Sequence, residues 1–300
     1  MPRRSHVYYV YVARILLATG CLVVIILASF VDAPEDKVVF LDVGQGDSIL
    51  LQDGTAQVLI DGGPGMTVLK RLGEEIPWFD KKIEVLILTH PERDHIEGLI
   101  HVLERYKVGL VLMPEVEHDS QLYAKFVSRL EETGVPRRWA RAGQRLRAGG
   151  MDFNILGPFD TPAAQAAARA SLNNASVMTR VDFCPEGATP RSLESEMGSC
   201  LSFLLTGDAE KRVERLLVAE AGKALNTDII KAGHHGSNTS THYELINAAS
   251  PKAAVISVGE NSYGHPCQEV LDRLGGIPIW RTDEHGSVHF ARVDDSWLAR

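Results

Sequence analysis

The sequence predicts an α/β protein built as a four-layer αββα sandwich and preceded by one N-terminal hydrophobic helix. Short apolar strands and amphipathic helices recur in both halves of the 300-residue chain, so each half supplies a group of strands with helices on its outer side. The first 33 residues differ from the rest, because residues 15–31 carry no charge. We therefore expect a signal-anchor or signal segment over 1–33 and one folded domain over 34–300.

The uncharged run is intermediate in length between the core of a signal peptide and a membrane-spanning helix, which needs about 20 residues. Arg3 and Arg4 precede the run, and a basic flank favours the cytoplasmic side. The sequence therefore predicts a single-helix membrane anchor with the domain outside the cytoplasm. The alternative is a signal that is cleaved, followed by secretion of the domain.

The first half of the domain contains short apolar runs that end at glycine or polar turns. These runs predict five strands, at residues 37–43, 48–52, 57–61, 83–89 and 108–113. Apolar side chains at helical spacing predict three helices, at residues 68–75, 95–106 and 121–132.

The second half repeats this mixture of strands and helices. Strands are expected at residues 176–183, 200–206, 227–232, 253–258, 278–281 and 287–291. Helices are expected at residues 209–220, 241–249 and 267–274. An alanine-rich stretch, 163–170, is either a further helix or a loop insertion.

The net charge is -8, from 31 Lys and Arg against 39 Asp and Glu. This balance argues against a protein that coats nucleic acid through its overall charge, but it allows local phosphate binding. It also allows a metal site rich in carboxylates. No protein partner can be inferred from the sequence.

The four cysteines contain no CxxC pair, which excludes a zinc ribbon and a thioredoxin-like redox motif. Cys184 and Cys200 bracket a polar segment. They either form a disulfide in an oxidising compartment or remain two unpaired side chains, and both possibilities stay open.

Histidines and carboxylates recur directly after the apolar strands. These residues are Asp61, His90, Glu92, Asp94, His95, Asp208, His234, His235 and His265. Imidazole and carboxylate together suit zinc, iron or manganese, and buried strands hold ligands firmly. We therefore expect the strand ends to converge on a metal site at one rim of the sandwich.

Several motifs in the same order resemble the metallo-β-lactamase fold superfamily, and most closely the C-terminal hydrolase domain of ComEC-type competence DNA-uptake proteins. The motifs are DVGQGDS (42–48), HxExDH (90–95), the Asn173-Asn174 pair, LLTGD (204–208), KxGHHGS (231–237), GHP (264–266) and RTDxxG (281–286). The resemblance implies that residues 34–300 form a metallo-β-lactamase-like hydrolase domain of αββα architecture.

The resemblance also implies one or two divalent ions, zinc or manganese. The implied ligands are His90 and Glu92 for one ion, Asp94 and His95 for the other, Asp208 between them, and His235 completing the second site. His234 would then contact substrate, although which of His234 and His235 binds metal stays open. Asp61 is expected to orient a ligating histidine.

The implied activity is metal-dependent hydrolysis, with a metal-activated hydroxide attacking a phosphodiester as in a phosphodiesterase or nuclease. The substrate would be a phosphate ester, either DNA or a cell-surface polymer. Residues expected to act on the substrate or to support the ligands are His234, Asp94, Lys231, Asn174, Ser237 and His265. Structural roles remain possible for three of them, since Ser237 could cap a helix, His265 could form a turn and Lys231 could be solvated.

This sequence departs from the wider superfamily at two positions. Glu92 replaces the second histidine, for which the competence branch usually has aspartate, and the Asn173-Asn174 region stands where a third histidine is expected. Oxygen ligands in place of imidazoles favour manganese over zinc. Hydrolysis of a lactam, lactone or thioester is the first alternative function, and a non-catalytic metal- or partner-binding module is the second.

Residues 137–147 hold five arginines and Trp139. Such a stretch could follow a phosphate backbone and stack a base. The other interpretation is a solvated hairpin with Trp139 in the core.

Overall fold

The computed structural model describes residues 8–9, 11–21, 35–184, 200–293 and 296–300. The chain divides into two compact units, residues 1–35 and 36–300. In the first unit residues 8–9 and 11–21 are helical. Among the described residues, no helix combines the length and the apolar character needed to cross a membrane. Of the predicted anchor or signal segment, 1–33, residues 1–7, 10 and 22–33 lie outside the described residues.

The second unit contains two mixed β-sheets. The first has eight strands in the order β15-β14-β1-β2-β3-β4-β5-β6 and the second has seven, in the order β13-β12-β11-β10-β9-β8-β7. The strands of the first sheet are β1 (Lys37–Phe40), β2 (Ile49–Asp53), β3 (Ala56–Ile60), β4 (Lys82–Ile87), β5 (Lys107–Met113), β6 (Arg137–Trp139), β14 (Val288–Val293) and β15 (Ser296–Ala299). Those of the second are β7 (Arg145–Ala148), β8 (Met151–Ile155), β9 (Thr179–Phe183), β10 (Leu201–Leu205), β11 (Ile229–Lys231), β12 (Ala253–Ile256) and β13 (Ile279–Arg281).

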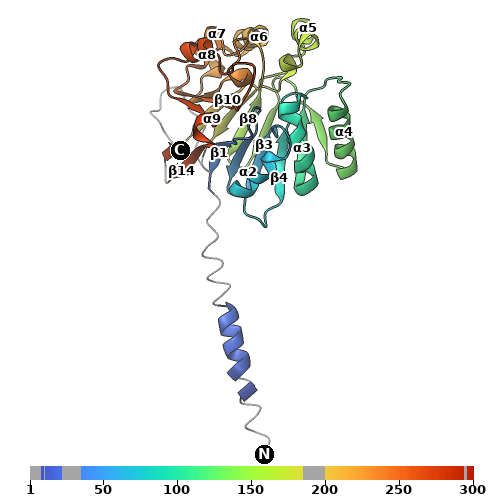
Figure 1. The fold of residues 1–300 in the computed structure, drawn as a ribbon, viewed down its shortest axis with the longest axis vertical. Coiled ribbons are helices and arrows are strands. Elements are labelled where there is room, and N and C mark those ends of the chain that lie inside the picture. Colours follow the sequence, from blue (N-terminus) through green and yellow to red (C-terminus); the bar gives the residue numbers. More distant parts are fainter. Residues whose placement is uncertain (1–7, 10, 22–34, 185–199, 294–295) are drawn as a thin grey trace, which may run out of the picture. The chain divides into compact units, whose positions relative to one another are not determined.

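Helices cover the outer face of each sheet (Figure 1). Beside the first sheet lie α2 (Thr67–Glu75), α3 (Arg93–Arg105) and α4 (Gln121–Thr133). On the second sheet lie α5 (Pro162–Ala170), α6 (Lys211–Ala221), α7 (Tyr243–Ala249) and α8 (Gln268–Arg273). Shorter helices are η1 (Leu172–Ala175), η2 (Gly222–Leu225), η3 (Gly233–Gly236) and α9 (Thr282–His285).

Three hydrophobic clusters fill the spaces between the layers. Phe40, Phe203 and Phe290 belong to the cluster between the sheets, where the rings of Phe203 and Phe290 lie 5.7 Å apart. The other two clusters lie between each sheet and its helices. Every residue of β1 is buried, because both of its faces are covered. The predicted four-layer αββα arrangement of the domain is therefore confirmed.

All the strands and helices expected from the periodic patterns are present, and the alanine-rich stretch is the helix α5. The sequence did not predict β6, β7, β8 and β15. β8 alternates buried and half-buried side chains with the period of a strand, so its pattern was readable. β6, β7 and β15 are short strands at the sheet edges with few buried side chains, so the apolar signal is weakest there.

The arginine-rich stretch is not a hairpin, because β6 belongs to the first sheet and β7 to the second. Trp139 packs against the hydrophobic cluster beneath the helices of the first sheet. The guanidinium of Arg137 lies over its ring, 5.4 Å from the centroid. The core interpretation of Trp139 is therefore confirmed, and its ring is not a free surface for stacking.

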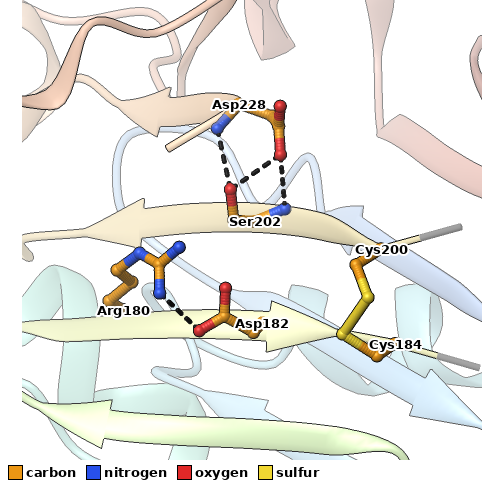
Figure 2. Close-up of a disulfide and its surroundings, with 6 residues drawn as sticks. All are labelled: Arg180, Asp182, Cys184, Cys200, Ser202 and Asp228. Atoms are coloured by element: carbon orange, nitrogen blue, oxygen red, sulfur yellow. Dashed lines mark hydrogen bonds and ion pairs between the residues drawn. A yellow bond between two sulfur atoms is a disulfide. The ribbon is translucent and has the colours of Figure 1, made fainter. Parts of the chain in front are cut away.

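Cys184 and Cys200 form a disulfide that joins the adjacent ends of β9 and β10 (Figure 2). The register pairs Phe183 with Leu201, so the two cysteines face each other across the ladder, with Cα atoms 4.2 Å apart. Of the two possibilities that the sequence left open, the structure shows the disulfide. Figure 2 also shows the carboxylate of Asp228 accepting hydrogen bonds from the backbone N–H and hydroxyl of Ser202, which ties β10 to the start of β11.

Candidate metal centre

The strand ends converge at the rim where the two sheets meet. Asp61 follows β3, His90 follows β4, and His95 lies in the first turn of α3. Asp208 follows β10 and His235 follows β11, from the opposite sheet. All five side chains are almost completely buried. The predicted convergence of strand-end ligands is therefore present in the structure.

Asp61 holds the imidazole of His95 in a fixed orientation. Its Oδ2 lies 2.8 Å from His95 Nδ1 and accepts a 2.5 Å hydrogen bond from the Thr89 hydroxyl. The Thr89 backbone N–H donates to the other carboxylate oxygen at 2.8 Å. His95 Nε2 is thereby directed at Asp208, 3.3 Å from its Oδ2. The contact between Asp61 and Nδ1 fixes the tautomer of His95 that presents Nε2 to an ion.

His235 reaches the same point from the second sheet. Its Nδ1 lies 2.9 Å from the Ser257 carbonyl oxygen, and its Nε2 lies 3.2 Å from Asp208 Oδ2 and 3.3 Å from Asp94 Oδ2. His234 and His235 both have left-handed backbones, with φ of 49° and 53°. In this turn the two neighbouring side chains point in different directions. His235 enters the cluster, and His234 remains half-buried beside it.

His90 completes the group of imidazoles. Its Nδ1 lies 3.0 Å from the Thr89 hydroxyl, and its ring centroid lies 4.1 Å from that of His95. Burial and the neighbouring His95 lower the pKa of His90 to about 3, so this imidazole is neutral and can act as a ligand.

The charged side chains of the cluster lie close together and shift one another's pKa. Burial opposes ionisation, yet His235 and His95 hold the pKa of Asp208 well below its usual value. Burial likewise opposes protonation of His95 and His235, yet Asp208 raises the pKa of both imidazoles well above the usual value. A site that draws protons onto buried imidazoles also attracts a metal cation in competition with those protons.

The residues fit a divalent ion because their inward atoms lack other partners. The Nε2 atoms of His90, His95 and His235 and the Oδ1 atom of Asp208 are buried and accept or donate no hydrogen bond among the described residues. Four groups of side chains bring ligand atoms within 4.8 Å of one another: His90–His95–Asp208, Asp94–His95–His235, Asp47–Asp208–His235 and Asp47–Asp61–His95. Mixed imidazole and carboxylate donors of this kind suit zinc or manganese.

Glu92 belongs to none of these four groups among the described residues. Its side chain is half-buried on the wall of the cavity beside Asp94. Burial and the charges of Asp94 and Asp208 raise its pKa. The ligand role expected for Glu92 therefore rests on the resemblance alone.

A cavity of about 490 Å³ opens over the cluster. His234, His265 and Tyr263 line it together with Glu92 and Asp94. The His234 and His265 rings lie 5.7 Å apart, so both predicted substrate-contacting histidines face the same space.

Lys231 lies beneath the cluster and is only 1% exposed. Its ammonium is 2.7 Å from Asp47 Oδ2 and donates to the Ala232 carbonyl oxygen at 3.1 Å. Burial alone would lower the pKa of Lys231, but Asp47 and Asp208 raise it. The ammonium therefore stays charged and faces a carboxylate, which excludes the solvated interpretation. Its expected role as a donor to substrate stays a prediction.

Two other predicted residues have structural contacts. The Asn174 side chain donates to Glu210 Oε2 at 2.8 Å and accepts from the Glu210 N–H at 3.1 Å, which fixes the start of α6. Its neighbour Asn173 is the one that approaches His234, with Nδ2 3.4 Å from Nε2. The Ser237 hydroxyl closes a turn with Thr239.

Asp47 is the residue that the sequence reasoning missed. Its carboxylate lies between Lys231 and His235, with Oδ1 3.4 Å from His235 Nδ1. Burial would raise the pKa of Asp47, yet Lys231 and His235 hold it below its usual range. The available signal was its place in the DVGQGDS motif, which marked the family without assigning the aspartate a role.

The fold and the buried His/Asp metal-binding cluster define a metallo-β-lactamase-type protein. The model of the metallo-beta-lactamase superfamily matches residues 41–162 of this chain. The chain is similar to ComE operon protein 3 of Bacillus subtilis (strain 168), with 32% identity over 277 residues that cover 85% of this chain and 33% of that protein. Competence protein ComA of Neisseria gonorrhoeae is 28% identical over 282 residues, covering 89% of this chain and 35% of that protein.

The chain thus spans about a third of the length of these curated relatives. Among solved structures, the metallo-beta-lactamase fold protein YhfI from Bacillus subtilis superposes with a TM-score of 0.54 at 12% identity, covering 85% of this chain and 99% of that one. This likeness supports the fold. The predicted resemblance to the superfamily and to the competence proteins is confirmed.

Proposed function

We propose that this chain is a metal-dependent phosphodiesterase that acts on a phosphate-ester polymer. The observation that carries the proposal is the set of three buried Nε2 atoms, from His90, His95 and His235, that surround Asp208 without hydrogen-bond partners. When bound, a divalent ion would polarise a phosphoryl oxygen and lower the pKa of a water molecule.

The protein's own residues supply orientation and proton transfer. Asp61 and the Ser257 carbonyl oxygen hold the rings of His95 and His235 in place. His234 Nδ1 lies 3.1 Å from the Thr239 hydroxyl. An Nδ1–H donated to that oxygen leaves Nε2 as the atom that gains or releases a proton beside the substrate.

The choice of phosphodiesters over lactams rests on the departures from the full histidine set. According to the resemblance, Glu92 and Asn173 stand where the wider superfamily has imidazoles; Glu92 lies on the cavity wall and Asn173 lies beside His234. Such donors suit harder ions, of which manganese is the one expected here. One relative is named Competence protein ComA, and the resemblance to competence DNA-uptake proteins favours a nucleic acid as the phosphate ester.

The test measures hydrolysis of bis-p-nitrophenyl phosphate, single-stranded DNA and nitrocefin by the purified protein with manganese or zinc. We expect phosphodiester cleavage and no nitrocefin hydrolysis. Asp208→Asn should lower metal affinity at least about 100-fold and abolish cleavage, whereas Asp119→Asn, at an exposed position, should match the wild type. A folded protein that cleaves no phosphodiester with either metal contradicts the proposal.

We further propose that the domain works outside the cytoplasm and is attached to the membrane by its N-terminal segment. The basic flank and the uncharged run at 15–31 support this location. The disulfide between Cys184 and Cys200 favours an oxidising compartment. Protease treatment of intact cells should digest the domain, and N-terminal sequencing of the recovered protein distinguishes an anchor from a cleaved signal.

A further inference from the structure

Tyr263 stands at the mouth of the cavity with 73% of its surface exposed. Its ring lies 5.8 Å from the His265 ring at an interplanar angle of 33°. The His265 ring in turn lies 5.7 Å from that of His234. A series of three rings therefore leads from solvent to the histidine to which the proposed function assigns proton transfer.

The loop that carries Tyr263 is ordered by one side chain. Asn261 Oδ1 accepts hydrogen bonds from the backbone N–H groups of Tyr263 and His265, each at 3.1 Å. Asn261 Nδ2 donates to the carbonyl oxygens of Gly259 at 2.8 Å and of His265 at 2.9 Å. These contacts hold the backbone at Tyr263 in place, so the loop presents the exposed ring at the mouth of the cavity.

The charge of the cavity does not favour a polyanion held by phosphate contacts alone. Among the described residues that line it, Arg93 is the single Lys or Arg, and its Nε is 3.0 Å from Glu97 Oε2. The whole chain carries a net charge of -8. Apart from a bound metal ion, the cavity therefore offers little positive charge to a phosphate polymer, and an exposed aromatic ring supplies a further interaction through stacking.

We propose that Tyr263 stacks a base of a single-stranded nucleic acid whose phosphodiester enters the cavity over the metal cluster. This inference rests on the proposed phosphodiesterase function and names its substrate class. A base presents a flat π-face that matches the exposed face of the ring, whereas a sugar-phosphate or polyol-phosphate polymer has no such face.

The experiment compares two fluorescein-labelled oligomers of equal length and charge, oligothymidylate and an abasic oligomer with the same phosphodiester linkages. Anisotropy with the full-length protein in EDTA reports binding without turnover, and cleavage is followed separately with manganese. Wild type should bind oligothymidylate about 5- to 150-fold more tightly than the abasic oligomer. Tyr263→Ala should abolish this preference and leave abasic binding unchanged, while Tyr263→Phe should retain it.

The matched control is Tyr243→Ala, at an exposed tyrosine on α7 outside the cavity lining, which should behave like wild type. Equal binding of the two oligomers by wild type, including no binding of either, overturns the stacking role. Preferential cleavage of the abasic oligomer overturns it as well and points to a polymer without bases. Because binding is read in EDTA, a base preference without cleavage supports the stacking role and counts only against the phosphodiesterase proposal.

Discussion

Replacing Lys231 by methionine tests the assignment of its ammonium to the floor of the metal centre. The Lys231 Nζ and Asp47 Oδ2 atoms are 2.7 Å apart, and the two side chains are 1% and 2% exposed. Removing one partner of such a buried pair typically costs about 3–5 kcal/mol, because the remaining charge is left without compensation. That loss is a large fraction of the stability of a typical domain.

The assay is urea unfolding followed by tryptophan fluorescence, first in EDTA and then with saturating manganese. In EDTA we expect Lys231→Met to lose about 3–5 kcal/mol of unfolding free energy. Manganese should restore part of this loss, because Asp47 forms one of the candidate ligand groups with Asp208 and His235 and a bound cation would offset its charge. Lys223→Met, at an exposed lysine, should stay within about 0.5 kcal/mol of wild type.

A different result would refute the reasoning. If Lys231→Met unfolds within about 1 kcal/mol of wild type in EDTA while its rate of cleavage falls, the ammonium acts on the substrate. The double variant Lys231→Met/Asp47→Asn adds a second check. It should recover part of the stability lost in the single variant, because no unpaired carboxylate remains.

Two further predictions concern the scaffold. The double variant Cys184→Ala/Cys200→Ala should unfold at a lower urea concentration than wild type. The expected loss of unfolding free energy is about 3 kcal/mol, because the disulfide closes a loop with a sequence separation of 16. A reductant that leaves the unfolding midpoint of the wild type unchanged would contradict this prediction. Burial opposes ionisation of Glu75, but hydrogen bonds from His289 and Lys37 lower its pKa to about 2. The stabilisation by Glu75 is therefore complete above its unfolded pKa near 4.5 and disappears as the pH falls through about 2. When the unfolding midpoints of wild type and Glu75→Gln are measured as a function of pH, the difference between them should shrink across that window.

Most of the layer architecture could be predicted because local patterns determine it. The largely apolar sequences of β4, β10 and β12 are typical of strands buried on both faces, and α3 shows the spacing of one apolar helix face. The edge strands β6 and β15 lack such a pattern, since few of their side chains are buried. Their pairing depends on neighbours that only the folded chain supplies.

The cluster was predictable where ligands follow strands and unpredictable where distant segments meet. His95 and Asp208 could be identified because each lies at the end of an apolar run. Asp47 could not be selected from the 39 acidic residues, since its role depends on contact with Lys231 far along the chain. Burial of Lys231 was hidden for the same reason, because a lysine at a strand end reads equally well as solvated.

The ligands of the candidate centre come from both sides of the sandwich. His90 and His95 follow β4 of the first sheet, with His95 in α3, and Asp208 and His235 follow β10 and β11 of the second. An ion held by the group His90–His95–Asp208 would cross-link the two sides of the sandwich at their rim. Its binding free energy would then add to the cohesion of the fold, about 2.7 kcal/mol at a free concentration 100 times the dissociation constant. Any strain that separates the sheets would release the ion. Metal supply would accordingly govern how long each copy of the chain survives proteolysis, as well as how fast it turns over substrate.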